Sequence, residues 1–417
     1  MQEQNFINKL YTNDNLFILN GMNSNFVDLI YLDPPFNSKR TYSAPVGSKA
    51  AGTSFKDMWT WDDVNEAYLE ILDEKYPALT SFITAVSMVH SSAMSAYLTY
   101  MAQRIIEMHR VLKDTGSLYL HCDPTASHYL KILLDEIFGK NNYRNEILWC
   151  YTGPGSPHMR QFNRKSDHIF WYSKGDKWTF NKDEVRLPYK DPNQRPRQAY
   201  LSVAGDDFSK DKIEQMRERG KIPENWWSDI AIVARSKTES TGYPTQKPLK
   251  LLRRIIEASS NEGDIILDPF CGCATTMVAA EQLGRNWIGI DIEKQAVGIL
   301  MERLKDASGV FDNFINETIP PKRSDVTIVE PTKKEIRARL YKEQNRICNG
   351  CGNEYLLKDL TTDHIVPVVM GGGSYYENYQ LLCANCNQTK NKYPMEFLRM
   401  KINARKSKMR TKIVFGR

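Results

Sequence analysis

The sequence predicts an α/β protein built on a doubly wound, mostly parallel sheet, with a second, smaller domain toward the C-terminal end. Short apolar runs alternate with longer amphipathic segments over most of the chain, which is the pattern of alternating strands and helices. Two Cys-x-x-Cys pairs then follow in the last part. A length of 417 residues exceeds one ordinary hydrophobic core, so two or three domains are expected.

Four apolar runs predict the strands of the sheet. Residues 26–36 (FVDLIYLDPPF) end in an acid and two prolines, as a buried parallel strand does. The other three runs cover residues 116–123, 264–272 and 285–293. Helical spacing of apolar residues predicts helices over 93–113 and 126–139, with Gly116 as the C-terminal cap of the first.

Two segments interrupt this alternation. Residues 176–243 are rich in Lys, Arg, Asp, Pro and Trp, with irregular stretches PNQRPRQAY and GKIPENWWSDI, and we interpret them as an inserted recognition region. Residues 316–334 contain three prolines and no periodicity, which is typical of a linker. The predicted domains are therefore 1–315 and 335–417, joined by 316–334.

The positive charge of the chain is concentrated in its last part. Residues 325–417 carry 17 Lys and Arg against 9 Asp and Glu, whereas the rest carries 39 against 41. The basic residues are densest in RMKINARKSKMRTK. A solvated charged helix would explain such a run, but beside a Cys/His cluster it favours a nucleic-acid surface.

The cysteines indicate a reducing compartment. No charged segment followed by an apolar core opens the sequence, so no signal peptide is expected. Paired Cys-x-x-Cys spacing then indicates thiolate–metal chemistry and not disulfides. The uncharged run 81–102 is broken by polar residues and is expected to be a buried or partner-facing helix. We expect a cytoplasmic protein with no membrane partner.

A strand–turn–helix segment predicts a nucleoside site. Asp268 follows a strand, and the small residues Gly272 and Ala274 would let a ligand approach the backbone near a helix N-terminus. A glycine turn alone could be a tight strand–helix joint. However, the next strand ends at Asp291, 23 residues after Asp268, where doubly wound nucleoside sites hold ribose hydroxyls.

Several motifs resemble those of DNA amino-methyltransferases. Asp33, Pro34, Pro35 and Phe36 form a DPPF sequence that resembles the catalytic motif of that family. Asp268, Phe270, Gly272, Thr275 and Thr276 resemble the S-adenosylmethionine motif, and residues 245–248, which include Lys247, resemble the segment before it. A catalytic motif that precedes the cofactor motif is the permuted order of the beta group. The resemblance covers about residues 1–315.

The resemblance implies a set of roles. Double-stranded DNA would be the substrate and S-adenosylmethionine the cofactor, with Lys247 and Thr275 in the binding segment. Asp268 and Gly272 would lie near the methionine part, Asp291 near the ribose, and Phe270 would pack against the cofactor. Asp14 would contact the adenine, although a helix or turn cap explains Asp14 equally well. Ala274 stands where the family usually has glycine, which narrows the loop.

The chemistry of the DPPF motif agrees with this resemblance. Transfer to an exocyclic base amine requires the base to leave the duplex. The Asp33 carboxylate and the Pro34 carbonyl could accept hydrogen bonds from the amine and localise its lone pair, while Phe36 stacks on the ring. DPPF is commoner among adenine-N6 enzymes of the family, so adenine is favoured, with cytosine N4 left open.

The tail combines a zinc motif with a free histidine. Cys348, Cys351, Cys383 and Cys386 supply four thiolates, which is enough for a closed tetrahedral zinc site. His364, in the sequence DHIVP, is then available for other chemistry. Together with GGG and ENYQLLCANCNQTK, this segment resembles the HNH nucleases, which have a small zinc-stapled ββα-metal fold, over about residues 345–393.

By this resemblance, His364 would be the general base that activates water, and Asn378 would orient its imidazole. Asp363 and Asn387 would bind one Mg²⁺ or Mn²⁺. Asn387 stands where the family frequently has histidine. The alternative is a zinc module that grips DNA without cutting it. One such site cuts one strand, so double-strand cleavage would need a homodimer or two visits.

The two halves together predict a single-chain restriction–modification protein, in which a methylase and an endonuclease share one recognition region. The competing interpretation is a phage or mobile-element methylase whose tail nicks DNA or cuts only modified DNA. The recognition sequence does not follow from the residues.

Overall fold

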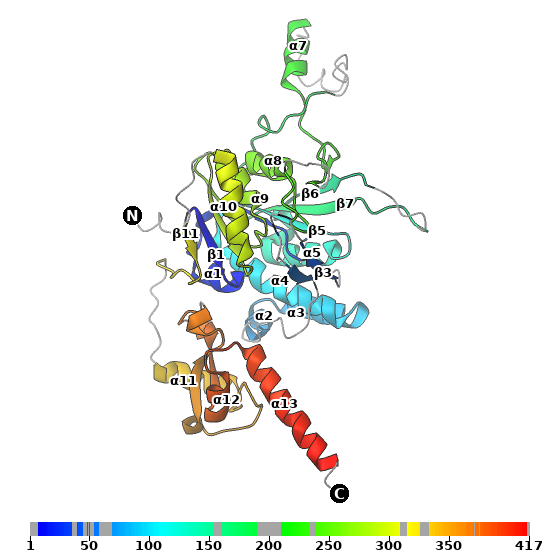
Figure 1. The fold of residues 1–417 in the computed structure, drawn as a ribbon. Helices are drawn as coiled ribbons and strands as arrows, with labels where there is room; N and C mark the ends of the chain where they lie inside the picture. The colour runs from blue at the N-terminus through cyan, green and yellow to red at the C-terminus, as the bar shows by residue number, and fades with distance from the viewer. Residues whose placement is uncertain are drawn as a thin grey trace. The chain divides into compact units, whose positions relative to one another are not determined.

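The computed structural model describes residues 7–35, 40–44, 48, 50, 54–57, 69–153, 160–189, 210–233, 239–308, 315–325, 333–370, 372–374 and 376–414. The chain divides into two compact units. The first comprises Met1–Asn15 and Ser24–Asn316, and the second comprises Leu16–Asn23 and Glu317–Arg417. The first unit contains the large sheet (Figure 1). The second contains the cysteine cluster.

A nine-stranded sheet organises the first unit, in the order β11-β1-β10-β9-β2-β5-β7-β6-β8. Its strands are β1 (Lys9–Thr12), β2 (Val27–Leu32), β5 (Leu112–Cys122), β6 (Tyr143–Cys150), β7 (Ser166–Ser173), β8 (Trp226–Trp227), β9 (Ile265–Asp268), β10 (Asn286–Asp291) and β11 (Ile315–Glu317). The strands from β1 through β10, β9 and β2 to β5 are parallel, and β7 is antiparallel to both β5 and β6. The predicted doubly wound, mostly parallel sheet is confirmed.

The helices of the first unit follow the apolar periodicity of the sequence. They are α2 (Leu69–Lys75), α3 (Pro77–Val89), α4 (Ser92–Val111), α5 (Ser127–Leu134), α7 (Lys210–Arg219), α8 (Leu249–Ser259), α9 (Thr275–Gln282) and α10 (Gln295–Ser308), whereas α1 (Asn15–Gly21) falls in the second unit from Leu16 on. Apolar residues of α8, α9 and α10 share one core with the strands β1, β2, β5, β6, β7 and β9. The predicted helix over 126–139 is observed as α5 followed by a single π-helical turn, Asp135–Gly139.

Gly116 does not cap a helix, so that prediction is wrong. Helix α4 ends at Val111, and the next residue is already extended with φ −68° and ψ 137°. Gly116 lies inside β5, in a stretch where the register with β2 shifts. A Cβ at Gly116 would lie 2.9 Å from the carbonyl oxygen of Asp28, so glycine is required there by close backbone approach and not by a helix end.

The segment predicted as a recognition insertion is not irregular throughout. The stretch PNQRPRQAY lies outside the described residues, but GKIPENWWSDI contains β8, which pairs with β6 at the edge of the sheet. Trp227 and Ile230 belong to the core. Helix α7, by contrast, projects from the body of the unit (Figure 1). Two antiparallel strands, β3 (Arg40–Ser43) and β4 (Ser54–Asp57), form a separate ribbon.

The second unit contains a ββα arrangement. Strands β12 (Leu360–His364) and β13 (Tyr379–Cys383) are antiparallel, and α12 (Ala384–Lys390) follows directly. Helices α11 (Lys333–Glu343) and α13 (Met395–Val414) complete the unit, and a small core joins them with both strands. The basic stretch RMKINARKSKMRTK lies on α13. Within the described part of the chain, no helix is long and apolar enough to cross a membrane.

Substitution of Gly116 by valine is expected to destabilise the first unit. The added Cβ would meet the Leu112 side chain at 2.6 Å and the Asp28 carbonyl at 2.9 Å, and we expect a loss of about 1–3 kcal/mol. Gly298→Ala is the matched control, because a Cβ on that residue of α10 has nothing within 4 Å. The free energy of unfolding of the Gly298→Ala variant should be higher than that of the wild type by about 0.5–1 kcal/mol. Thermal or urea unfolding of both variants measures the difference, and equal stabilities would contradict it.

Candidate active sites

Four acids gather at one edge of the large sheet. Asp33, Asp268 and Asp291 lie at the carboxyl ends of β2, β9 and β10, and Asp14 follows β1. These strands are neighbours and parallel, so their carboxyl ends share one edge. The edge is where doubly wound sheets place ligands. The four predicted carboxylates are therefore brought into one region.

Asp33 forms an ion pair with a residue 214 positions away. Its Oδ2 accepts a hydrogen bond of 2.5 Å from Lys247 Nζ, and the two side chains are only 17% and 9% exposed. Among the described residues, its Oδ1 is buried and has no hydrogen-bond partner. A buried oxygen without a partner costs about 1–3 kcal/mol, so Oδ1 is available to a donor from a ligand. Pro34 and Pro35 follow outside any helix or strand, and Phe36 lies outside the described residues.

Asp268 holds the turn between β9 and α9. Its Oδ1 accepts from the Phe270 N–H at 3.0 Å, and its Oδ2 accepts from the Thr276 hydroxyl at 2.5 Å. Burial, together with the charges of Asp33 and Asp291, raises the pKa of Asp268 to about 7. Both carboxylate oxygens therefore brace the loop, and Asp268 is partly protonated near neutral pH.

Gly272 and Asp291 connect two strand ends. The Gly272 N–H donates to Asp291 Oδ2 at 2.7 Å, and the Glu293 N–H donates to Oδ1 at 2.8 Å. Burial raises the pKa of Asp291 to about 6. Gly272 has φ +48°, and a Cβ there would lie 3.2 Å from the Tyr243 ring, so a side chain would fill the space between loop and ring. Glycine is therefore required at this turn by its positive φ and by the Tyr243 ring that packs against it.

The loop that carries Gly272 is braced from α10. Arg303 donates to the Cys273 carbonyl at 2.6 Å and to the Thr275 hydroxyl at 2.8 Å, and all three groups are buried. Ala274 has φ +64°, which is unusual for a residue with a Cβ. Alanine thus occupies the left-handed position that favours glycine, and the Arg303 hydrogen bonds hold the loop in that shape.

Asp14 is paired with an arginine that the sequence did not single out. Arg104, on α4 and only 2% exposed, donates to both oxygens of Asp14 at 2.8 and 3.0 Å. It also donates through Nε to Asn15 Oδ1 at 2.6 Å, while Asn15 Nδ2 donates to the Pro269 carbonyl. Arg104 therefore joins the end of β1 to the loop after β9. The Asp14 side chain remains 34% exposed.

A buried chain of hydrogen bonds lies beside Asp33. Tyr31, two residues earlier on β2, bonds through its hydroxyl to His121 Nδ1, and His121 Nε2 bonds to Asp167 Oδ2 at 3.0 Å. Asp167 Oδ1 accepts from the Tyr151 hydroxyl. Burial opposes ionisation of Asp167, but the His121 hydrogen bond and the charges of His121 and Lys247 lower its pKa overall. His121 is thus a fully buried structural residue.

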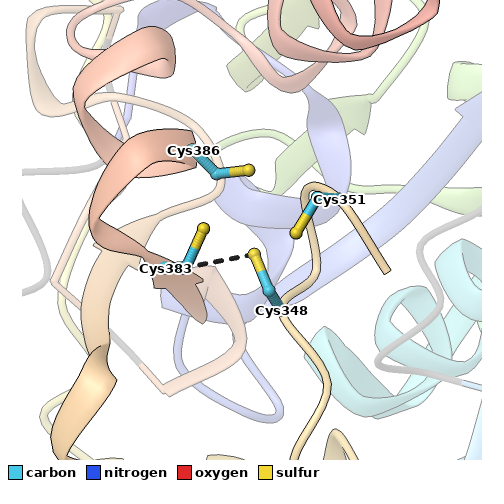
Figure 2. Close-up of side chains that lie close together, drawn as sticks. All are labelled: Cys348, Cys351, Cys383 and Cys386. Carbon is cyan, nitrogen blue, oxygen red and sulfur yellow. Dashed lines mark hydrogen bonds between the residues drawn. The ribbon is translucent and has the colours of Figure 1, made fainter. Parts of the chain in front are cut away.

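The four cysteines of the second unit converge, as Figure 2 shows. Their sulfur atoms lie within 4.8 Å of one another. Cys348 and Cys351 come from the turn after α11, whereas Cys383 and Cys386 come from the end of β13 and the first turn of α12. Four thiolates at this spacing fit a tetrahedral zinc ion. The Cys348 sulfur already accepts from the Cys383 and Gly350 N–H groups.

His364 ends β12 outside the cysteine cluster. Its Nε2 lies 3.2 Å from the Ser374 hydroxyl, and its ring packs against Tyr379. Partial burial lowers the pKa of His364. The charge of Lys390 also lowers it, whereas the charge of Asp363 raises it. The imidazole is therefore neutral near pH 7 and able to accept a proton.

Asn378 contacts the loop after His364 and not the imidazole. Its Oδ1 accepts from the Val366 N–H, and its Nδ2 donates to the carbonyls of Val366 and Gly373. The residue is fully buried. Among the described residues, the side-chain hydrogen bonds of Asn378 reach the loop after His364, and its role in orienting the imidazole stays a prediction.

Asp363 and Asn387 differ in their surroundings. Asp363 Oδ2 accepts from Gln380 at 2.9 Å and from Lys390 at 3.0 Å. Asn387 is more exposed and donates through its amide to the Thr361 hydroxyl at 2.9 Å. Thr361 and Asp363 are two residues apart on β12, so they lie on the same face of that strand. Asp363 Oδ1 and Asn387 Oδ1 remain as oxygen donors for a hard cation.

Sequence reasoning missed several residues that hold these sites, namely Arg104, Tyr243, Arg303, His121, Asp167 and Lys390. Lys390 is the last residue of CNQTK, and the other five lie outside the catalytic and cofactor motifs. Each acts through a contact between distant parts of the chain, so local spacing carries no signal for it.

The fold and the two clusters define a DNA methylase with an added nuclease module, and comparison with known proteins agrees. A family model described as DNA methylase, of the N6/N4 type, matches residues 27–302, and one described as HNH endonuclease matches residues 348–393. The chain therefore belongs to the N6/N4 DNA methylase family and contains an HNH endonuclease domain.

The individual relatives include type II methyltransferases and a DNA adenine methyltransferase. The type II methyltransferase M.HpaI of Haemophilus parainfluenzae is 30% identical over 71% of this chain and 74% of its own length. M.EcaI of Enterobacter cloacae is 26% identical over 75% and 72%, and the DNA adenine methyltransferase YhdJ of Escherichia coli is 29% identical over 68% and 77%. A solved M1.HpyAVI–SAM complex is 20% identical with a TM-score of 0.40, over 71% of this chain and 98% of that one.

Asp268→Asn is expected to remove a pH dependence of stability. The pKa of Asp268 is about 7 when folded and near 4 when unfolded, so the folded state binds the extra proton between these values. The free energy of unfolding therefore falls as pH rises through this window. From pH 5 to 8, the wild type should lose roughly 1–4 kcal/mol relative to the variant. Urea unfolding across this range measures it, and parallel curves would refute it.

Proposed function

We propose that the first unit transfers a methyl group from S-adenosylmethionine to the exocyclic amine of a DNA base, with adenine N6 as the favoured target. The observation that carries this proposal is the buried Oδ1 of Asp33, which has no hydrogen-bond partner among the described residues. A base amine would supply the missing donor. Membership of the N6/N4 family supports the reaction.

Asp33 and Lys247 have different proposed roles at the target nucleobase. Lys247 holds Asp33 Oδ2, which fixes the carboxylate and turns Oδ1 toward the incoming amine. The Oδ1 atom and the Pro34 carbonyl then accept hydrogen bonds from the two N–H groups of the amine and localise the nitrogen lone pair for attack. Proline has no N–H, so the chain after Asp33 presents acceptors only. Phe36 is proposed to stack on the flipped ring.

The cofactor would lie over the loop between β9 and α9. Asp291, whose carboxylate is held at the end of β10 by the Gly272 and Glu293 N–H groups, is proposed to bind the ribose hydroxyls. Phe270 and Asp14 are proposed to contact the nucleoside, while Asp268 and Thr275 keep the loop in shape. S-adenosylmethionine supplies an electrophilic methyl on its sulfonium.

Adenine is favoured over cytosine on two grounds. The DPPF sequence resembles the adenine-N6 version of the motif, and YhdJ, a relative at 29% identity, is named an adenine methyltransferase. Cytosine N4 is the alternative, because the family includes both.

For the HNH domain we propose metal-dependent cleavage of DNA, with zinc in the cysteine cluster. Neutral His364 accepts a proton from water as it attacks a phosphodiester. Asn378 holds the loop beyond His364, and Asp363 with Asn387 would hold Mg²⁺ or Mn²⁺. That cation would stabilise charge on the transferred phosphate. The alternative is a zinc module that binds DNA without cutting it.

We propose that the whole chain is a restriction–modification protein in which methylation protects the sites that the HNH domain would cut. Type II methyltransferases among the relatives support this role. Cleavage of modified DNA by a mobile-element enzyme is the second candidate. Double-stranded DNA is the shared substrate.

Separate substitutions should remove the two activities independently. Asp33→Ala loses the acceptor for the amine, so methylation should fall at least about a hundredfold while cleavage persists. His364→Ala loses the general base, so cleavage should fall about 10²–10⁴-fold while methylation persists. Methylation sequencing of DNA from a host that expresses His364→Ala gives the target base and the site, and we expect N6-methyladenine.

Matched controls replace similar residues far from the chemistry. Asp114→Ala removes an acid that is 80% exposed, and His90→Ala removes an exposed histidine, so both should keep both activities. Folded variants of Asp33 and His364 that each lost both activities would contradict two separate sites. N4-methylcytosine in the sequencing would reassign the target base.

Digestion of plasmid DNA separates the biological roles. Unmethylated plasmid and plasmid methylated by the His364→Ala variant are each incubated with the wild-type protein, in Mg²⁺ or in a chelator of divalent cations. We expect cutting of the unmethylated plasmid alone, and only with Mg²⁺. Cutting of the methylated plasmid alone would support the mobile-element role, and no cutting would support a DNA-gripping module.

A further inference from the structure

A buried lysine lies in the middle of the HNH site. Lys390, the last residue of α12, has no exposed surface. Its Nζ lies 3.0 Å from Asp363 Oδ2 and donates to the His364 carbonyl at 2.7 Å. Burial of an ammonium group is costly unless it is paired, and these two contacts supply its partners. The ion pair therefore belongs to the folded site and not to its surface.

The positive charge of Lys390 reduces the net negative charge that a cation would meet at this site. Asp363 is the acidic residue among the proposed metal ligands, and Asn387 contributes only a neutral amide oxygen. The two ligands carry a formal charge of −1, and together with Lys390 at 3.0 Å the formal charge of the site is zero. The charges that act on His364 are likewise Asp363 and Lys390, which have opposite signs.

A site with no net charge binds divalent cations weakly. Affinity for hard cations rises with the number of charged ligands, and Mg²⁺ is usually held by one or two carboxylates together with substrate phosphates. Lys390 cancels the one carboxylate here, and it also repels a dication directly. The negative charge that completes such a site must come from elsewhere, and a DNA phosphate is the ligand that the reaction brings.

We propose that Lys390 neutralises Asp363 so that the HNH site takes up its divalent cation only together with a DNA phosphate. The inference rests on the proposed nuclease function. Lys390 is then a positioning residue: it fixes Asp363 Oδ2, leaves Oδ1 for the cation, and anchors the end of β12 through the His364 carbonyl. The site would be assembled on DNA and would stay unloaded in free protein.

Mn²⁺ binding to the full-length, zinc-loaded protein tests this proposal without measuring cleavage. Electron paramagnetic resonance of free Mn²⁺ gives the amount bound. Wild type should show weak binding that depends on Asp363, and Lys390→Gln, which keeps a donor but removes the charge, should bind at least about tenfold tighter. Lys390→Met is a second uncharged variant, to be used if Lys390→Gln does not fold. Zinc content and circular dichroism report folding.

Two controls isolate the charge at this position. Lys390→Arg keeps the charge and should bind as weakly as wild type, and Lys392→Met removes a nearby exposed charge and should change nothing. Adding Asp363→Asn to Lys390→Gln should abolish the gain. A DNA duplex added to the His364→Ala protein should create Mn²⁺ binding that is lost with Asp363→Asn.

The outcomes separate the two proposals. Equal affinity of wild type and Lys390→Gln, or tight Mn²⁺ binding by wild type without DNA, would overturn the role of Lys390 and leave the nuclease standing. Absence of any Asp363-dependent Mn²⁺ binding, with DNA present, would overturn the metal-dependent nuclease itself.

Discussion

The methylase site depends on keeping four carboxylates together at the edge of one sheet. Parallel pairing of β1, β10, β9 and β2 forces Asp14, Asp291, Asp268 and Asp33 into one region, where like charges repel and burial removes their hydration. Each acid is compensated differently. Arg104 and Lys247 neutralise the outer two, whereas backbone N–H groups and one hydroxyl support Asp291 and Asp268, whose pKa values rise to about 6 and 7.

The same principle recurs in the HNH domain on a smaller scale. A unit with a small apolar core is held by a cysteine cluster that fits zinc and by a buried asparagine that ties the loop after His364. Asp363 again has a lysine partner. In both units an ammonium group holds one oxygen of the key aspartate and leaves the other available. The lysine thereby orients the carboxylate and also neutralises its negative charge.

Local sequence patterns predicted most of the fold. The predictions failed at positions where contacts with residues far away in the sequence determine the conformation. Apolar runs located β2, β9 and β10 because buried parallel strands have continuous apolar sequence. Gly116 resembled a helix cap, but its conformation is set by the approach of Asp28 across the sheet. Within GKIPENWWSDI, which the sequence presents as irregular, Trp227 packs in the core because β8 pairs with β6, and the recognition role of residues 176–243 stays a prediction.

The sequence by itself determined the class of each site, because DPPF, the Asp268 to Thr276 segment and the paired cysteines carry their chemistry within a few residues. Only the tertiary structure decided how those groups are held. The pairing of Asp33 with Lys247 spans 214 residues, Arg104 reaches Asp14 across 90, and Lys390 reaches Asp363 from another element. Burial and hydrogen bonds between distant segments determine which oxygen of a carboxylate can bind a ligand, and they determine the charge and the pKa of that carboxylate. The local spacing of residues encodes none of these properties.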